Sequence, residues 1–219
     1  MIIDERYITL SEIINSDKIE ISNDKKFVDH INETHNFLIN EIKDGKPIYG
    51  ITTGYGASGK NYVSYEDSKI LQTNLFRFHG CGVGKKLSYK VCKYALIART
   101  ISLSKAKSGV SIELLKKLEM LIQKDIIPVI PSQGSVGASG DLTPLSYIAA
   151  VVAGEREVYY KGEIKDVMEV YKELNITPYT FKPKEALAIM NGTTIMSAIA
   201  LAAIEEFETI LDSMESFVA

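Results

Sequence analysis

A run of very small residues lies near the middle of the chain, in the stretch GSVGASGDLTPL that begins at Gly134. Within it, Ala138, Ser139 and Gly140 are consecutive. If the backbone folds tightly here, the amide nitrogen of Gly140 can reach the carbonyl carbon of Ala138, and glycine is the residue best able to take the dihedrals that this contact demands. Ring closure with loss of two waters would give an imidazolone whose exocyclic methylene comes from Ser139. That methylene is an electrophile, which no unmodified side chain offers.

The same stretch also has a simpler interpretation, as a loop that leads into a helix. Thr143 is a good N-cap and Pro144 suits the first helical position, so a helix is expected to begin there. Asp141 would then complement the positive end of that helix. Composition alone favours this loop, although an electrophile placed before a helix N-terminus would gain the same electrostatic support.

A second glycine-rich stretch, YGITTGYGASGK, runs from Tyr49 to Lys60. Its last seven residues, Gly54 to Lys60, satisfy the G-x-x-x-x-G-K pattern of a phosphate-binding loop and follow a strand-like segment, 47–53. Such a loop needs Ser or Thr next, to bind magnesium, and a helix that starts at the lysine. Asn61 stands there instead, so a nucleotide-binding protein remains only a distant alternative.

A third stretch, LQTNLFRFHGCGVG, ends a predicted helix with Phe78 and His79. A single histidine at a helix C-terminus usually caps the last carbonyl groups. His30 and His35 lie in another, charged helix, where we expect both to be exposed, and we assign them no role.

These stretches and a fourth, EALAIMNGTT, which contains Asn191, occur in an order and spacing that resembles one enzyme family. It is the family of aromatic amino acid ammonia-lyases and aminomutases that depend on 4-methylideneimidazole-5-one (MIO): histidine, phenylalanine and tyrosine ammonia-lyases and tyrosine aminomutases. The resemblance covers essentially the whole chain, and the triad within GSVGASGDL is highly specific. It implies elimination of ammonia from an aromatic L-amino acid to give an α,β-unsaturated acid. The electrophile would be MIO, self-made from Ala138-Ser139-Gly140, without a metal. A tyrosine 2,3-aminomutase is the nearest alternative because it shares these residues.

The resemblance also implies a role for each further site residue. Tyr49 matches the catalytic base that removes a β-proton from the substrate, and Asn191 matches a polar residue beside the ring that helps to hold the substrate. Gly56 matches a small position that lets the backbone approach the substrate. Phe78 and His79 match the pair that meets the substrate side chain. This Phe-His pair mixes the patterns of the known branches, and because His79 can hydrogen-bond a phenol or an imidazole, tyrosine is slightly favoured among histidine, phenylalanine and tyrosine.

Helical periodicity dominates the rest of the chain. Apolar spacing predicts helices at 24–43, 65–78, 88–105 and 111–124, and again from 183 to the end except at Asn191-Gly192. Glu157 to Lys165 predicts a β-hairpin that turns at Lys161-Gly162. We therefore expect a mainly α fold with a small β component. The resemblance implies the N-terminal part of the ammonia-lyase (fumarase/aspartase-like) helical fold, with a lyase domain at 1–182 and the start of a central helical bundle at 183–219.

Members of the family are more than twice as long as this chain. The resemblance implies that their second half supplies a tyrosine loop and an arginine for the substrate carboxylate, and that three subunits of a homotetramer share each active site. We therefore expect the chain to be an N-terminal fragment, inactive alone, that assembles into an oligomer or with a C-terminal half. A non-catalytic assembly module is the alternative from another class.

Composition excludes several other classes. The 219 residues are 46% hydrophobic and 24% charged with a net charge of −3, which argues against disorder and against nucleic-acid or anionic-membrane partners. The longest apolar stretch, Ile195 to Ile204, is too short to span a bilayer, and the N-terminus lacks the pattern of a signal peptide. Cys81 and Cys92 are too few for a disulfide framework or a metal cluster. We expect a cytoplasmic protein with both thiols reduced and buried.

Overall fold

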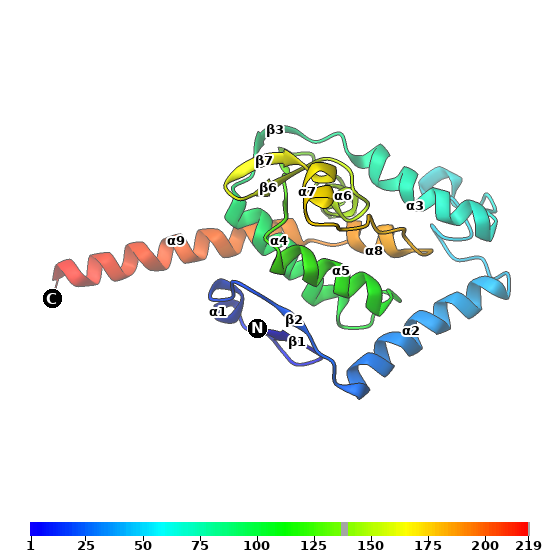
Figure 1. Ribbon diagram of the computed structural model, residues 1–219, viewed down its shortest axis with the longest axis horizontal. Helices are drawn as coiled ribbons and strands as arrows, with labels where there is room; N and C mark the ends of the chain where they lie inside the picture. Colours follow the sequence, from blue (N-terminus) through cyan, green and yellow to red (C-terminus); the bar gives the residue numbers. More distant parts are fainter. Residues whose placement is uncertain (137–139, 219) are drawn as a thin grey trace.

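Helices surround a buried centre in this computed structural model, which describes residues 1–136 and 140–218 (Figure 1). Two helices form that centre, α4 (Tyr89–Leu103) and α6 (Leu142–Val152), and most of their residues are buried. Helix α6 is apolar almost all round, as a helix enclosed by others must be, and α4 is largely apolar beyond Lys90 and Lys93 in its first turns. Helices α5 (Ile112–Gln123) and α9 (Thr194–Val218) pack on α4, while α3 (Tyr65–His79) and α8 (Glu185–Met190) pack on α6.

The predicted helices are confirmed within a residue or two, because their start signals act locally. A serine or aspartate side chain accepts a hydrogen bond from the first turn of each of four helices, which is the standard N-cap interaction. The caps are Asp24 for α2 (Lys25–Lys43), Ser64 for α3, Ser88 for α4 and Ser111 for α5. The break at Asn191-Gly192 is confirmed as well, since α8 ends at Met190 and α9 begins at Thr194.

Among the residues that the structure describes, short strands form three small sheets beside the helices. Strand β1 (Ile2–Ile3) pairs in parallel with β2 (Glu20–Ile21), and β3 (Val83–Lys86) pairs antiparallel with β5 (Pro131–Gln133). The predicted hairpin is confirmed as β6 (Glu157–Tyr160) and β7 (Glu163–Asp166), with β4 (Ile127–Pro128) on its outer edge. Lys161 and Gly162 both have positive φ, which suits the tight turn between twisted strands.

The segment at 47–53 does not form the expected strand. It is a series of turns, and its one ladder contact is a bridge between Thr53 and Tyr62. The residues that follow form a short 3₁₀ helix, Gly56–Ser58, and the next α-helix starts only at Tyr65. A phosphate-binding loop requires a strand before it and a helix at Lys60, so its structural context is lacking here.

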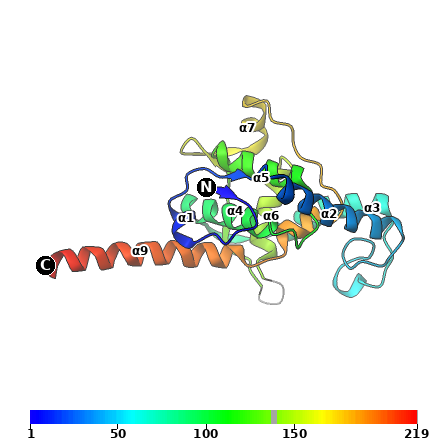
Figure 2. The same ribbon diagram turned by 90° about the horizontal axis from the view of Figure 1, so that it is seen from below.

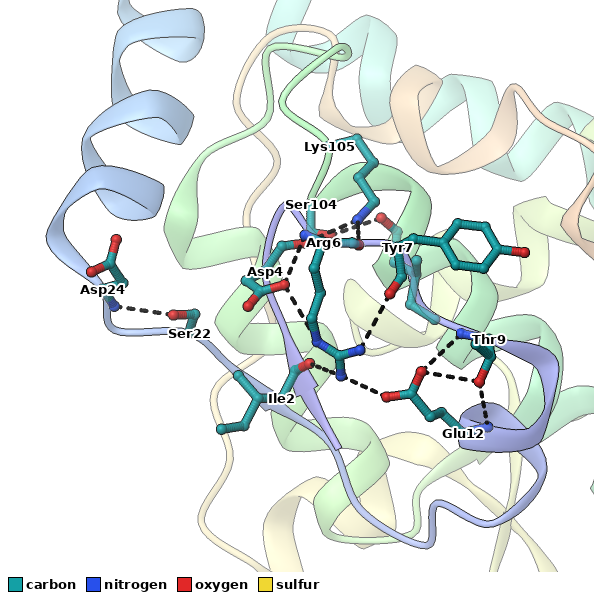
Figure 3. A network of polar contacts seen from close by, with 11 residues as sticks. Ile2, Asp4, Arg6, Tyr7, Thr9, Glu12, Ser22, Asp24, Ser104 and Lys105 are labelled. Atoms are coloured by element: carbon teal, nitrogen blue, oxygen red, sulfur yellow. Dashed lines mark hydrogen bonds and ion pairs between the residues drawn. The ribbon is translucent and has the colours of Figure 1, made fainter.

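A polar network ties the N-terminal segment together and attaches it to the end of α4 (Figure 3). The Arg6 guanidinium lies 2.7 Å from the Glu12 carboxylate, which also accepts from the backbone amide of Thr9 in a capping box for α1 (Leu10–Ile14). Hydrogen bonds from Arg6 and Thr9 lower the pKa of Glu12 to about 2. Lys105 donates to the carbonyl oxygens of Asp4 and Arg6 at 3.0 and 2.6 Å.

The last helix, α9, packs on α4 with its first half and projects beyond the body with its second (Figure 1). Its outer face carries exposed apolar side chains: Met196, Ile199, Ile204, Phe207, Ile210, Leu211, Met214 and Phe217. By length and composition alone, the helical stretch Glu185–Phe217 could cross a membrane, with mean hydropathy 1.8. In that apolar window 44% is buried inside the protein, and a single helix of this kind is weak evidence of a membrane span, because core helices pass the same test. The predicted boundary at residue 183 remains a prediction.

Two smaller expectations are wrong. His35 is buried rather than exposed, because its Nδ1 bonds the carbonyl oxygen of Gly109 at 2.9 Å beneath the loop that precedes α5. Cys92 is buried as expected, but Cys81 is exposed, because it lies in a glycine-flanked loop after α3 that has no core to enter.

Candidate active site

Tyr49 and Gly56 come together in the loop between α2 and α3. The Gly56 backbone amide donates a hydrogen bond of 2.8 Å to the Tyr49 hydroxyl oxygen, and the Tyr49 side chain is 60% exposed. Gly56 has φ +55 with open space around its Cα, so the requirement for glycine there is conformational. A phenol oxygen that accepts from an amide is placed to carry negative charge.

A second tyrosine in the loop, Tyr55, is a poor candidate for a base. Its ring meets the Tyr49 ring edge-on, with centroids 6.2 Å apart. Burial raises the pKa of Tyr55 to about 12, against a smaller opposing effect of the Gln72 amide. Of the two phenols, Tyr49 is therefore the one that could exchange a proton with a bound molecule.

The end of α3 presents Phe78 and His79 differently. Phe78 is 80% exposed, whereas His79 is half-buried with its Nδ1 2.9 Å from the carbonyl oxygen of Leu75, one turn back in the same helix. A carbonyl oxygen can only accept, so Nδ1 carries the proton and Nε2 of the neutral ring is a hydrogen-bond acceptor. The simple expectation of a capping histidine is thus fulfilled, and one ring nitrogen remains for a ligand.

Of the triad, Ala138 and Ser139 lie outside the described residues, and Gly140 is described. Gly140 has φ +80, and a methyl group on its Cα would lie 2.4 Å from the carbonyl oxygen of Gly192. Ser135 closes the base of the loop, because its hydroxyl lies 3.3 Å from the Gly140 carbonyl oxygen and 2.8 Å from the Asp141 carboxylate. Only glycine fits at position 140, for both conformational and steric reasons.

Asp141 caps a helix other than the one expected. Its side chain is 4% exposed and makes no cap bond to α6, which begins at Leu142 rather than at Thr143. One carboxylate oxygen instead accepts from the backbone amides of Ile195 and Met196, both at 3.0 Å, at the start of α9. The negative charge therefore complements the positive end of α9. Sequence reasoning missed this link because the partners are more than fifty positions apart.

Asn191 lies in the break between α8 and α9, where its side chain is exposed. The neighbouring Gly192 carbonyl accepts from the Asp141 amide at 2.8 Å and contacts Gly140. A cavity of about 260 Å³ opens beside this junction, lined by Gly134, Ser135, Asp141 and the first turns of α9. A larger cavity of about 540 Å³, lined by residues including His30, Glu33 and Lys184, contains none of the predicted site residues.

The predicted site residues thus form separate groups. Gly140 and the residue after Asn191 are in contact, and Tyr49 and Gly56 are in contact, but in the described ranges no hydrogen bond joins the two pairs. Figure 2 shows the loop after α2 at the end of the molecule opposite the C-terminus, away from the start of α6. The Tyr49 loop nevertheless touches α8, where Leu187 lies against Gly50. Across residues 1–136 and 140–218, no three His, Cys, Asp or Glu side chains cluster to hold a metal.

Comparison with known proteins identifies the family. Residues 8–219 match the model of the family described as aromatic amino acid lyase, so the chain belongs to this family. It is 42% identical to a histidine ammonia-lyase of Shouchella clausii (strain KSM-K16) over 178 residues, which are 81% of this chain and 36% of that enzyme.

Solved structures agree on the fold. A histidine ammonia-lyase from Trypanosoma cruzi matches with a TM-score of 0.82 and 30% identity, over 93% of this chain and 39% of that one. A tyrosine aminomutase from Streptomyces globisporus matches with a TM-score of 0.83 and 28% identity, over 91% and 38%. The fold is therefore that of the ammonia-lyases and aminomutases, and the chain spans little more than a third of the length of these relatives.

Proposed function

We propose that this chain carries part of the active site of an aromatic amino acid ammonia-lyase whose electrophile forms from Ala138-Ser139-Gly140. The constraint on Gly140 is the observation that carries the proposal. Its positive φ and the lack of room for a Cβ suit a residue whose amide nitrogen must turn back on the chain. The Ser135 hydroxyl contacts the Gly140 carbonyl oxygen and the Asp141 carboxylate, which fixes the backbone at the exit of the triad. The 42% identity to a histidine ammonia-lyase supports the same conclusion.

These residues fit an MIO group in the triad. When formed, the group supplies an electrophilic carbon for the substrate amine. Gly140 provides the backbone geometry and Asp141 holds it against the start of α9. Tyr49 acts as the phenolate: its oxygen takes a β-proton from the substrate and becomes the neutral hydroxyl. The Gly56 amide stabilises the negative charge that this oxygen carries before the transfer. Asn191, exposed in the break between helices, binds the substrate through its amide group.

The His79 ring supports a proposal for the substrate class. Because Nδ1 donates to the Leu75 carbonyl, Nε2 accepts, and a substrate ring that can donate a hydrogen bond is favoured. Imidazole and phenol both donate, whereas a phenyl ring does not. The identity to a histidine ammonia-lyase leads us to place histidine first and tyrosine second.

A tyrosine 2,3-aminomutase is the second candidate, because a solved aminomutase structure matches with a TM-score of 0.83. Both reactions would use the same residues of this chain. Product analysis separates them, since a lyase releases an arylacrylate and ammonia, and a mutase retains nitrogen in a β-amino acid.

We further propose that a second copy brings its own Tyr49 to the triad, in a homotetramer. The separation of the Tyr49 loop from Gly140 supports this arrangement, and the exposed apolar face of α9 offers a surface for assembly. Turnover would also need residues beyond these 219, because the relatives are nearly three times as long.

The test has two parts. Intact-mass measurement of the purified chain should show a mass lower by two water molecules than its sequence predicts. The Ser139→Ala variant should show the full mass that its own sequence predicts. An ultraviolet assay of the native assembly against histidine, tyrosine and phenylalanine should show product from the first or second, and none after Ser139→Ala. Deamination by the Ser139→Ala variant at the rate of the unmutated protein would refute the proposal.

A further inference from the structure

A buried arginine of α4 sits under the break between α8 and α9. Arg99 is 4% exposed, and its Nη2 donates to the carbonyl oxygens of Ala188 and, at 3.0 Å, of Asn191. Ala188 lies in the last turn of α8, whose carbonyls lack an intrahelical partner, and Asn191 is the residue that follows the helix. Arg99 therefore caps α8 from a neighbouring helix, and α8, with only six residues, depends on such outside contacts.

The same guanidinium also contacts the next residue, Gly192. A methyl group on Gly192 would lie 2.2 Å from Nη1, so the two groups are packed tightly together. The Gly192 carbonyl on the other side accepts from the Asp141 amide and touches Gly140. A continuous line of contact thus runs from Arg99 through Asn191-Gly192 to the exit of the triad.

This cation has an unusual environment for a purely structural residue. In the described part of the chain, no carboxylate lies within ion-pair distance of Arg99, and its buried Nε has no hydrogen-bond partner. Burial lowers the pKa of Arg99 to about 10, so the group remains charged at neutral pH. Burying an unpaired charge lowers the stability of a fold, and a hydrophobic side chain of similar size at the same position often gives a more stable protein.

We propose that Arg99 is a positioning residue, which holds the backbone of Asn191 and Gly192 so that the Asn191 amide and Gly140 face one another. The proposal rests on the proposed function for its catalytic readout. The negatively charged Asp141 holds the start of α9, and the positively charged Arg99 holds the carbonyl of Asn191 after the end of α8. The break between the two helices is therefore held from both sides.

The primary test compares Arg99→Lys with Lys117→Met. Lysine keeps the charge but cannot bridge two carbonyls with a planar fork. Lys117 is a matched control, because it is a half-buried cation that donates to the Thr177 carbonyl at 2.8 Å and lies over the Tyr171 ring, away from the triad. We expect Arg99→Lys to lower hydrogen-exchange protection of the Asp141 amide at least tenfold and to reduce the closed-ring fraction. Lys117→Met should change neither.

In the active assembly, Arg99→Lys should lower kcat by about 10–100-fold, because a small displacement of a positioned group is enough for such a loss. Unchanged exchange at Asp141 together with an unchanged ring fraction in a folded Arg99→Lys protein would overturn the proposal. If the unmutated chain shows no ring and the native assembly shows no deamination, the proposed function fails, while the exchange comparison still decides the role of Arg99.

A double-mutant cycle guards against a general folding defect. Gly192→Ala should push the guanidinium away, because the methyl group meets only the far end of a flexible side chain. Combined with Arg99→Lys, it should lower Asp141 exchange protection less than the sum of the two single effects, since both changes break one contact. Additive effects would mean that Arg99 and Gly192 act independently, against the proposal.

Discussion

The Asp141 carboxylate accepts a hydrogen bond of 3.0 Å from the backbone amide of Ile195. The residue that follows the triad therefore caps α9, a helix that begins more than fifty residues further along the chain. Removing its charge should therefore destabilise α9 rather than α6. We expect Asp141→Asn to lower the free energy of unfolding by about 1–3 kcal/mol, the range for hydrogen bonds to a buried charged group. Chemical denaturation measures the change.

Asp166→Asn is the matched control. Asp166 caps α7 (Val167–Glu173) through the Met168 amide at 2.8 Å, but it is exposed, and asparagine caps about as well as aspartate. If Asp141→Asn lowers the free energy of unfolding no more than Asp166→Asn does, the negative charge at the start of α9 has no special role.

Gly140 and Gly162 have nearly the same backbone conformation and different surroundings. Their φ values are +80 and +78, but a methyl group meets the Gly192 carbonyl oxygen at position 140 and nothing within 4 Å at position 162. We expect Gly162→Ala to cost about 1–2 kcal/mol for the left-handed backbone alone. Gly140→Ala should cost about 1–3 kcal/mol more through overpacking, and it should abolish ring closure. Denaturation and intact mass give the two readouts, and equal costs at both positions would mean that crowding at Gly140 adds nothing to the cost of its backbone conformation.

Tyr49→Phe should lower kcat of the active assembly by about 10²–10⁴-fold, because it removes the oxygen that accepts the substrate proton. Ring closure should continue, since the ring forms from atoms of the triad alone and Tyr49 makes no contact with Gly140 of the same chain. Tyr62→Phe is the control from the same loop, with a side chain that is 73% exposed, and it should leave kcat unchanged. Comparable losses from both changes would point to a disturbed loop instead of a lost base.

The Glu12 carboxyl should make the N-terminal segment sensitive to acid. Hydrogen bonds from Arg6 and Thr9 lower its folded pKa to about 2 from an ordinary value of 4.5. A lowered folded pKa contributes stability that is fully present above about 4.5 and is lost as the pH falls toward 2. Glu12→Gln should flatten the dependence of unfolding free energy on pH in that window.

Arg6→Gln should flatten the same part of the profile, and the double variant should add little, because the two side chains act as one pair. A profile that stays as steep in Glu12→Gln as in the unmutated chain would assign the acid sensitivity elsewhere.

Sequence patterns predicted the helices well because caps and apolar spacing act over a few residues. Ser88 and Ser111 mark the starts of α4 and α5 by side-chain bonds to their own first turns. The strand predicted at 47–53 was wrong because local preference was the only signal there. Its β-branched residues favour a strand, but the Thr52 and Thr53 hydroxyl groups accept hydrogen bonds from backbone amides within turns.

The candidate site was predictable as a set of motifs but not as an arrangement. Tyr49 and Gly56 are close in sequence and meet in one loop. The contacts of Asp141 with α9 and of Arg99 with Asn191 join residues from distant parts of the chain, and no periodicity reports them. Arg99 gave a weak signal, as the basic residue of α4 that lies among apolar neighbours, away from Lys90 and Lys93 in the first turns.

The contact of Gly140 with Gly192 sets an order of events. Gly192 lies against position 140 in the folded chain, so the proposed cyclisation would wait until these distant parts of the chain have docked. Because the reaction forms covalent bonds, a molecule that later unfolds would keep its ring. The mass of each molecule would then record whether it had ever been native.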